Sequence, residues 1–123
     1  MDGVLSAKDL LKLGMRNYKE CVDYNWHGRM IKIKYMLSRE EMLKLIHDIE
    51  NMCVTESGNF IPGLLDFSIR LNVVSDYAYV ELPENIDDIY NLLYHSDIYD
   101  AVASNINQNQ LNAIMDCFGI DRR

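Results

Sequence analysis

Apolar and polar residues alternate over residues 22–26 and again over residues 31–35, which is the period of a half-buried β-strand. His27 and Gly28 lie between the two runs and predict the two-residue turn of a β-hairpin. The implied register pairs Val22 with Ile33, Asp23 with Lys32, Tyr24 with Ile31 and Trp26 with Arg29. Because a two-stranded hairpin is marginally stable alone, we expect helices to cover its apolar face.

Six helices are predicted from apolar residues that recur at steps of three and four, each preceded by a capping residue or a proline. The strongest start is at Ser38, where Glu41 completes a capping box. The first helix, starting at Ser6, is expected to run to about Asn17, and Gly14 weakens it. The remaining starts are Pro62, Asn85, Ser96 and Asn107, and Gly119 is the expected stop of the last helix.

Residues 67–73 alternate strictly between apolar and polar, so this segment also fits a strand. We favour a helix because the apolar stripe is longer than a typical strand and continues to the break at Leu82-Pro83. The stripe consists of Leu64, Phe67, Leu71, Val74 and Ala78.

These elements predict an α+β, mainly α fold, in which a bundle of about five helices carries one N-terminal β-hairpin. Residues 1–21 are expected to form an N-terminal helix or extension, and residues 22–123 a single domain. A chain of 123 residues can bury roughly two-thirds of its unfolded surface, so it needs no disulfide or metal to fold.

The three cysteines, Cys21, Cys53 and Cys117, lie far apart and show no CxxC spacing. We expect them to be reduced core residues of a cytosolic protein. The first residues lack the basic and apolar regions of a signal peptide, and no run of 18 apolar residues occurs. The predicted location is therefore the cytoplasm, without a membrane partner.

The net charge of −7 is unevenly distributed along the chain. Residues 1–37 hold seven Lys or Arg and four Asp or Glu, whereas residues 38–123 hold five and fifteen. No Lys or Arg occurs from Leu71 to Asp121, where nine acidic residues lie. An acidic surface of this kind serves solubility or receives a basic protein partner, and it argues against nucleic acid as a ligand.

No residue pattern indicates catalysis, a metal site or a cofactor. His27, His47 and His95 are isolated from one another and from the cysteines, and no P-loop, GxSxG or GxGxxG motif occurs. Adjacent acidic pairs at predicted helix starts are typical of helix capping. We therefore expect a protein that is not an enzyme.

Tyrosines gather in the region without basic residues, and tyrosine provides a large contact area at low entropic cost. A protein-binding surface is one interpretation, and tyrosines that edge the core with their hydroxyls in water are the other. The residues predicted to bind a protein are Tyr79, Glu84, Asp87, Asp88, Tyr90, Tyr94 and Tyr99.

Short stretches between about Val22 and Phe118 carry a family resemblance. They are Trp26-His27-Gly28, Ile31-Lys32-Ile33-Lys34, Ser38-Arg39-Glu40-Glu41-Met42, Ile61-Pro62, Phe67-Ser68-Ile69-Arg70-Leu71-Asn72-Val73-Val74 with Tyr77, Leu82-Pro83, and Ile106-Asn107 with Leu111. Together they resemble small proteins of tailed phages and prophages of Gram-positive bacteria, in particular the tail assembly chaperone-like group. The helix before Val22 lies outside this pattern.

The resemblance implies a noncatalytic, acidic protein that binds the tape measure protein during morphogenesis and helps recruit tail tube subunits in the bacterial host cell. Independently of the resemblance, the acidic, tyrosine-bearing region from Asp76 to Asp100 is expected to bind a basic or helical protein partner or a basic patch on another copy of the chain. The alternative is an acidic regulatory or inhibitory module, of the kind that mimics DNA and acts on a host protein. Both interpretations need an exposed acidic surface.

Overall fold

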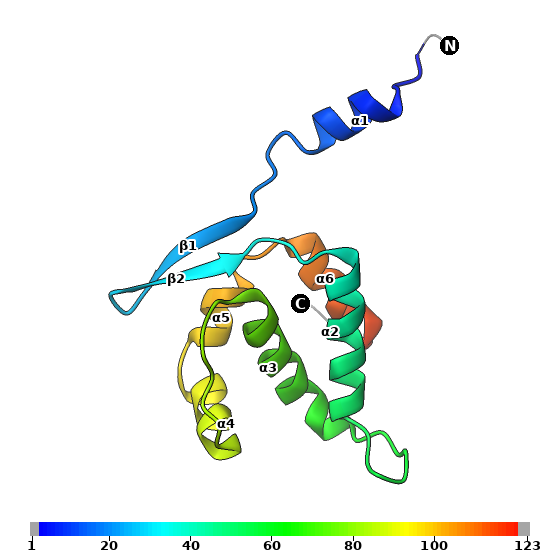
Figure 1. Ribbon diagram of the computed structural model, residues 1–123. Coiled ribbons are helices and arrows are strands. Elements are labelled where there is room, and N and C mark those ends of the chain that lie inside the picture. The colour runs from blue at the N-terminus through cyan, green and yellow to red at the C-terminus, as the bar shows by residue number, and fades with distance from the viewer. Residues whose placement is uncertain (1–2, 121–123) are drawn as a thin grey trace.

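The computed structural model describes residues 3–120. Residues 1–2 and 121–123 lie outside the described part. They are the ends of the two predicted domain ranges, and Asp121 is also the last residue of the stretch without Lys or Arg. Within it, six α-helices and one two-stranded antiparallel sheet form the predicted α+β, mainly α fold (Figure 1).

The β-hairpin consists of β1 (Cys21–Trp26) and β2 (Arg29–Lys34), and its register is the predicted one along its whole length. The turn residues His27 and Gly28 have φ angles of 50° and 84°. Both angles lie in the left-handed region that a tight two-residue hairpin turn requires. On the apolar face, Ile33 is completely buried, so the helices cover the hairpin as expected.

The helix α2 (Arg39–Met52) starts with the predicted capping box. Ser38 Oγ accepts a hydrogen bond from the Glu41 N–H at 3.2 Å, and Glu41 Oε1 accepts one from the Ser38 N–H at 2.9 Å. Lys34 Nζ of β2 lies 2.6 Å from Glu41 Oε2. The hydrogen bond from Lys34, followed by that from the Ser38 backbone, lowers the pKa of Glu41 to about 2.

The segment whose pattern fitted both a strand and a helix is helical, because α3 spans Leu65–Tyr77. A single 3₁₀ turn over Pro62–Leu64 leads into it, so Pro62 starts this turn instead of the α-helix. The length of the apolar stripe was therefore the correct guide, and the strict alternation was not.

The end of α3 was predicted wrongly, since the helix stops at Tyr77 and not at Leu82-Pro83. Ala78 is extended and forms an antiparallel bridge with Ile33, and the Tyr79 N–H donates a hydrogen bond to the Lys32 carbonyl at 3.0 Å. The segment that follows α3 thus pairs with the free edge of β2. This contact joins residues distant in sequence and outweighs the local pattern.

α3 is the centre of the bundle and packs against α2, α4 (Ile86–His95) and α5 (Ile98–Ala103) (Figure 1). Val73, Val74 and Tyr77 on α3 are completely buried. The last helix, α6 (Gln108–Cys117), ends before Gly119, whose φ of 67° fits the predicted helix stop.

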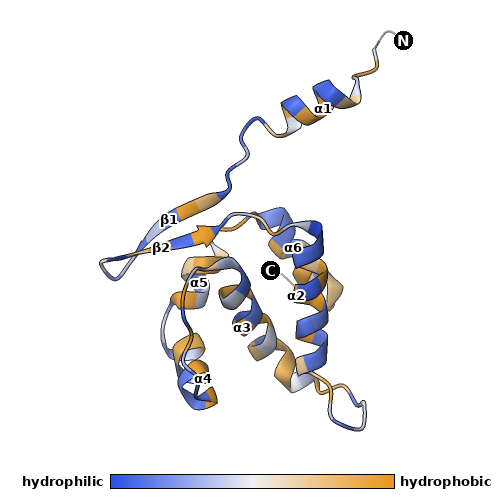
Figure 2. Ribbon diagram, in the orientation of Figure 1, coloured by the Kyte–Doolittle hydropathy of each residue, from blue (hydrophilic) through white to orange (hydrophobic). Residues whose placement is uncertain are grey.

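The helix α1 (Ala7–Gly14) is capped by Ser6 as predicted but ends earlier than the expected Asn17. None of its residues is buried. It projects away from the bundle on the chain that leads into β1 (Figure 1), and it carries apolar residues along its length (Figure 2).

The cysteines are free thiols, but only Cys53 belongs to the core. Cys21 is half-buried and Cys117 is exposed, so the prediction of three core cysteines was wrong for these two. Over residues 3–120, the helices are all too short or too polar to cross a lipid bilayer.

Candidate functional site

The first turn of α4 collects carboxylates at the molecular surface. Asn85 caps the helix, and its Oδ1 accepts hydrogen bonds from the N–H groups of Asp87 at 2.8 Å and Asp88 at 3.2 Å. Glu84, Asp87 and Asp88 are all exposed. Because the N-terminus of a helix carries partial positive charge, these acids are stabilised there and can at the same time face a partner.

Three aromatic rings stack beside these carboxylates. Phe67 of α3 lies 5.9 Å from Tyr90 and 6.5 Å from Tyr94 of α4, measured between ring centroids, and the two tyrosine rings are 4.7 Å apart. Tyr90 and Tyr94 are one helical turn apart and remain 53% and 40% exposed. The stack therefore presents a rigid aromatic surface to solvent.

Arg70 of α3 supplies a counter-charge in the region that lacks basic residues in sequence. Its Nε lies 2.9 Å from Asp66 Oδ2, and its guanidinium lies 4.7 Å from the ring centre of Tyr94 and 4.8 Å from that of Tyr99. The Tyr94 hydroxyl donates a hydrogen bond to the same Asp66 oxygen at 2.6 Å. Burial, followed by this hydrogen bond, raises the pKa of Tyr94 to about 12.

Arg70 brings a counter-charge to the acidic region, although the sequence has no Lys or Arg from Leu71 to Asp121. One arginine just before the stretch reaches over two of its tyrosines and also donates a hydrogen bond to the Leu93 carbonyl. The carboxylates of Glu84, Asp87 and Asp88 lie at the other end of α4, with Glu84 just before its N-cap, and no ion pair with a basic side chain joins them within the described part.

The aromatic stack forms one wall of a hollow of about 390 Å³, which we call the aromatic groove. Leu64 and Ile86, 43% and 58% exposed, contribute its aliphatic part, although Leu64 was assigned to an apolar stripe from the sequence. The groove is lined by Gly63, Leu64, Phe67, Ile86, Asp87, Tyr90 and Tyr94.

A signal for the groove is present in the spacing along α4. Ile86, Tyr90 and Tyr94 recur every four residues and face outward, whereas Leu93 belongs to a second row that is buried in the core. The helix therefore carries two apolar rows instead of one. The outward row marks the groove.

Four of the predicted site residues are not in the groove lining, and two of these, Tyr79 and Tyr99, also lie apart from the start of α4. Tyr79 is 61% exposed beside β2, where its backbone N–H bonds to Lys32. Tyr99 is half-buried and packs against the same Arg70 guanidinium as Tyr94. The structure thus brings Asp87, Tyr90 and Tyr94 together, with Glu84 and Asp88 alongside on the same helix start.

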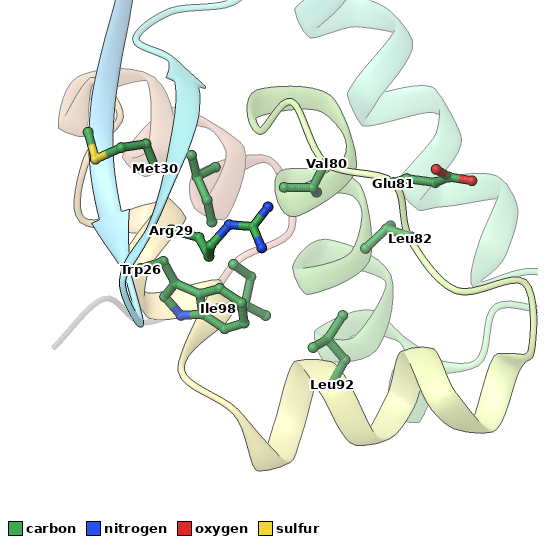
Figure 3. Close-up of a pocket in the computed structure, with 9 residues that line it drawn as sticks. Trp26, Arg29, Met30, Val80, Glu81, Leu82, Leu92 and Ile98 are labelled. Atoms are coloured by element: carbon green, nitrogen blue, oxygen red, sulfur yellow. The ribbon is translucent and has the colours of Figure 1, made fainter.

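A second hollow of about 310 Å³ lies between the hairpin tip, the segment after α3, α4 and α5 (Figure 3). Trp26, Leu92 and Ile98 are part of its apolar lining, and the Arg29 side chain extends across it. Sequence reasoning did not predict this hairpin cleft, because its walls come from segments about 70 residues apart.

Asp97 fixes one wall of the hairpin cleft. Its Oδ1 accepts a hydrogen bond from Trp26 Nε1 at 2.8 Å and lies 3.1 Å from His27 Nε2. The bond from Trp26, followed by that from His27, lowers the pKa of Asp97. The turn histidine therefore has a structural role at the hairpin tip.

Binding is the chemistry that these surfaces support, since the exposed groups are aromatic rings, aliphatic side chains and carboxylates. Among residues 3–120, no three potential metal ligands lie close enough to hold an ion together. Comparisons with protein-family models, curated proteins and solved structures found no match for this chain.

Proposed function

We propose that this chain is a noncatalytic protein-binding module whose aromatic groove receives a basic, apolar helix of a partner protein. The observation that carries the proposal is the exposed stack of Phe67, Tyr90 and Tyr94 with carboxylates beside it. Hydrophobic grooves bind amphipathic helices whose apolar anchors are spaced one turn apart, and tyrosine is enriched where binding energy concentrates.

The two kinds of side chain have different parts in binding. Burial of Ile86 and Tyr90 against a partner removes apolar surface from water and slows dissociation. The carboxylates of Glu84, Asp87 and Asp88 attract a basic partner and raise the association rate. Asp66 contributes less to this field, because Arg70 neutralises it.

The finer proposal is that the partner belongs to the tail of a bacterial virus, either the tape measure protein or the tail tube protein, and that binding takes place in the host cytoplasm during assembly. The resemblance to tail assembly chaperone-like proteins supports it, together with an exposed surface that fits transient protein contacts.

The alternative proposal, an acidic inhibitor that mimics DNA, rests on the carboxylates at the start of α4 alone. It requires that a host DNA-binding protein recognise Glu84, Asp87 and Asp88 without the aromatic rings. The two proposals therefore differ in the importance of Tyr90.

Tyr90→Ser tests both proposals with the full chain and purified tape measure and tail tube proteins from the phage or prophage that carries this reading frame. We expect binding in the wild type and faster dissociation in the variant, by about tenfold or more, because an exposed aromatic anchor is lost. Tyr18→Ser removes an exposed tyrosine outside the groove and should leave dissociation unchanged. Failure of the wild type to bind either protein would refute the finer proposal.

A further inference from the structure

The N-terminal arm, defined here as residues 4–19, carries a helix whose apolar side is uncovered. Leu10, Leu11 and Leu13 on α1 are 61%, 67% and 51% exposed. An isolated helix of eight residues is marginal in water, and contiguous exposed apolar side chains usually mark a binding segment. Further exposed apolar residues of the arm are Val4, Leu5 and Met15.

The arm is also the most basic part of the chain. It contains Lys8, Lys12, Arg16 and Lys19 against the single acid Asp9. Lys8 and Lys12 are one turn apart and therefore lie on one side of α1, where they border the leucines. The arm is thus an apolar helix edged with positive charge.

The aromatic groove has the complementary properties. Its lining is apolar and aromatic, and Asp87 at its edge is followed by Asp88 in the same helical turn. We propose that α1 of one copy docks in the aromatic groove of a second copy, with its leucines on Ile86 and Tyr90 and its lysines toward the carboxylates. The groove is therefore occupied by a segment of this same chain, whose leucines match its apolar lining and whose lysines match its carboxylates.

The arm docks in the groove of another copy because the point at which it joins the hairpin is held away from the groove of its own copy. The Tyr35 N–H donates a hydrogen bond to the Glu20 carbonyl at 3.0 Å, and Lys19 Nζ lies 5.3 Å from the centre of the Tyr35 ring. These contacts hold the end of the arm beside the base of the hairpin. α1 leaves from there in the direction opposite to α4 (Figure 1).

Pairing of two α1 helices with each other fits less well than docking in the groove. Such a pair would bring Lys8 and Lys12 of both copies together with Asp9 as the one acid of each helix, and the helix has only about two turns of contact. The groove provides the aromatic surface and the negative charge that another α1 lacks.

Arm and groove are different surfaces, so the contact is heterologous. Two copies can exchange arms reciprocally, or further copies can add in succession. A small contact of this kind gives weak association that depends on concentration. Because the arm uses the same groove as the proposed foreign partner, self-association and partner binding compete, yet self-association does not require that partner to exist.

Sedimentation of the full chain over a range of concentrations and salt tests the proposal. We expect a monomer at low concentration and reversible association at high concentration, weakened by salt. Leu10→Gln with Leu11→Gln should abolish it, and folding should persist because α1 contributes nothing to the core. Glu40→Lys, in the first turn of α2 and outside the groove lining, is the control and should associate like the wild type.

A charge-swap pair distinguishes arm-to-groove docking from other association. Lys8→Glu with Lys12→Glu makes the arm acidic, and Asp87→Lys with Asp88→Lys makes the groove basic, so each variant alone should self-associate about tenfold more weakly. In an equimolar mixture every arm meets a groove of opposite charge, and association should return. Circular dichroism verifies that both variants remain folded.

Three outcomes would overturn the proposal: a monomer at every concentration, association that survives the leucine substitutions, or a mixture that associates no better than its components. Binding of the wild type to anionic phospholipid vesicles without self-association would also overturn it, since α1 would then be a membrane-surface helix. None of these outcomes bears on tape measure binding, which is measured separately.

Discussion

Ile33→Ala tests the packing of the hairpin on the bundle. Ile33 is completely buried, faces Val22 across the hairpin and forms a bridge with Ala78 after α3. The substitution removes three carbon atoms from a site that cannot collapse freely, because two strands and the end of α3 hold it. Transfer and cavity terms together give a loss of about 2–5 kcal/mol in the free energy of unfolding.

Thermal unfolding followed by far-ultraviolet circular dichroism measures the effect. At about 4 °C per kcal/mol for a domain of this size, Ile33→Ala should lower Tm by about 8–20 °C. Lys32→Ala is the matched control on the opposite face of the same strand. Lys32 is exposed, and its carbonyl keeps the bond to Tyr79, so the change should stay within about 0.5 kcal/mol. Equal melting of the two variants would refute the register or the burial of this face.

Three further changes test other contacts. Gly28→Ala should cost about 1–2 kcal/mol in denaturant unfolding, because a φ of 84° is unfavourable for alanine, and no loss would contradict the turn. Arg70→Met should cost about 1–2 kcal/mol and change the near-ultraviolet signal of Tyr94 and Tyr99; an unchanged signal would contradict the packing of Arg70 on these two rings. The lowered pKa of Glu41, about 2 against 4.5 unfolded, stabilises the fold above pH 4.5, and this contribution disappears as the pH falls toward 2. Because Glu41 is 44% exposed, Glu41→Gln should cost only about 1–2 kcal/mol at neutral pH, with a flatter profile in that window; parallel profiles would contradict it.

The hairpin and the helix starts could be predicted because their determinants are local. Alternation fixes which residues share a face, and a two-residue turn then leaves one register, which the structure has. The capping residues Ser6, Ser38, Asn85 and Asn107 all accept the expected backbone hydrogen bonds.

The end of α3 depends on a contact that no local pattern contains. The apolar row runs on past Tyr77, but Ala78 finds a partner in Ile33, some 45 residues away along the chain. The sequence of residues 77–82 is compatible with either outcome. The position of β2 decides between them.

The candidate site was predicted in part for the same reason. The groove contains Asp87, Tyr90 and Tyr94 together because all three lie on α4. Tyr79, in contrast, lies in a segment that pairs with β2 and is therefore held apart from the groove. The contribution of Phe67 depends on how α3 packs against α4, and the sequence of either helix alone does not determine this.

The uncovered side of α1 could not be inferred either, because an apolar stripe predicts burial without naming the surface that provides it. Leu10 and Leu11 have the pattern of core residues and yet are exposed in the single chain. A stripe with no cover in the monomer is what a segment that binds a second molecule would show.

The most direct test of the aromatic groove as a protein-binding surface is the rate at which tape measure fragments associate with the immobilised full chain at low and high salt. Replacement of Glu84, Asp87 and Asp88 by lysine should slow association and remove most of its salt dependence, while Glu40→Lys should change neither. Binding that is equally fast in both variants and insensitive to salt would contradict a role for these carboxylates in recognition, and would leave the acidic surface with solubility as its only function.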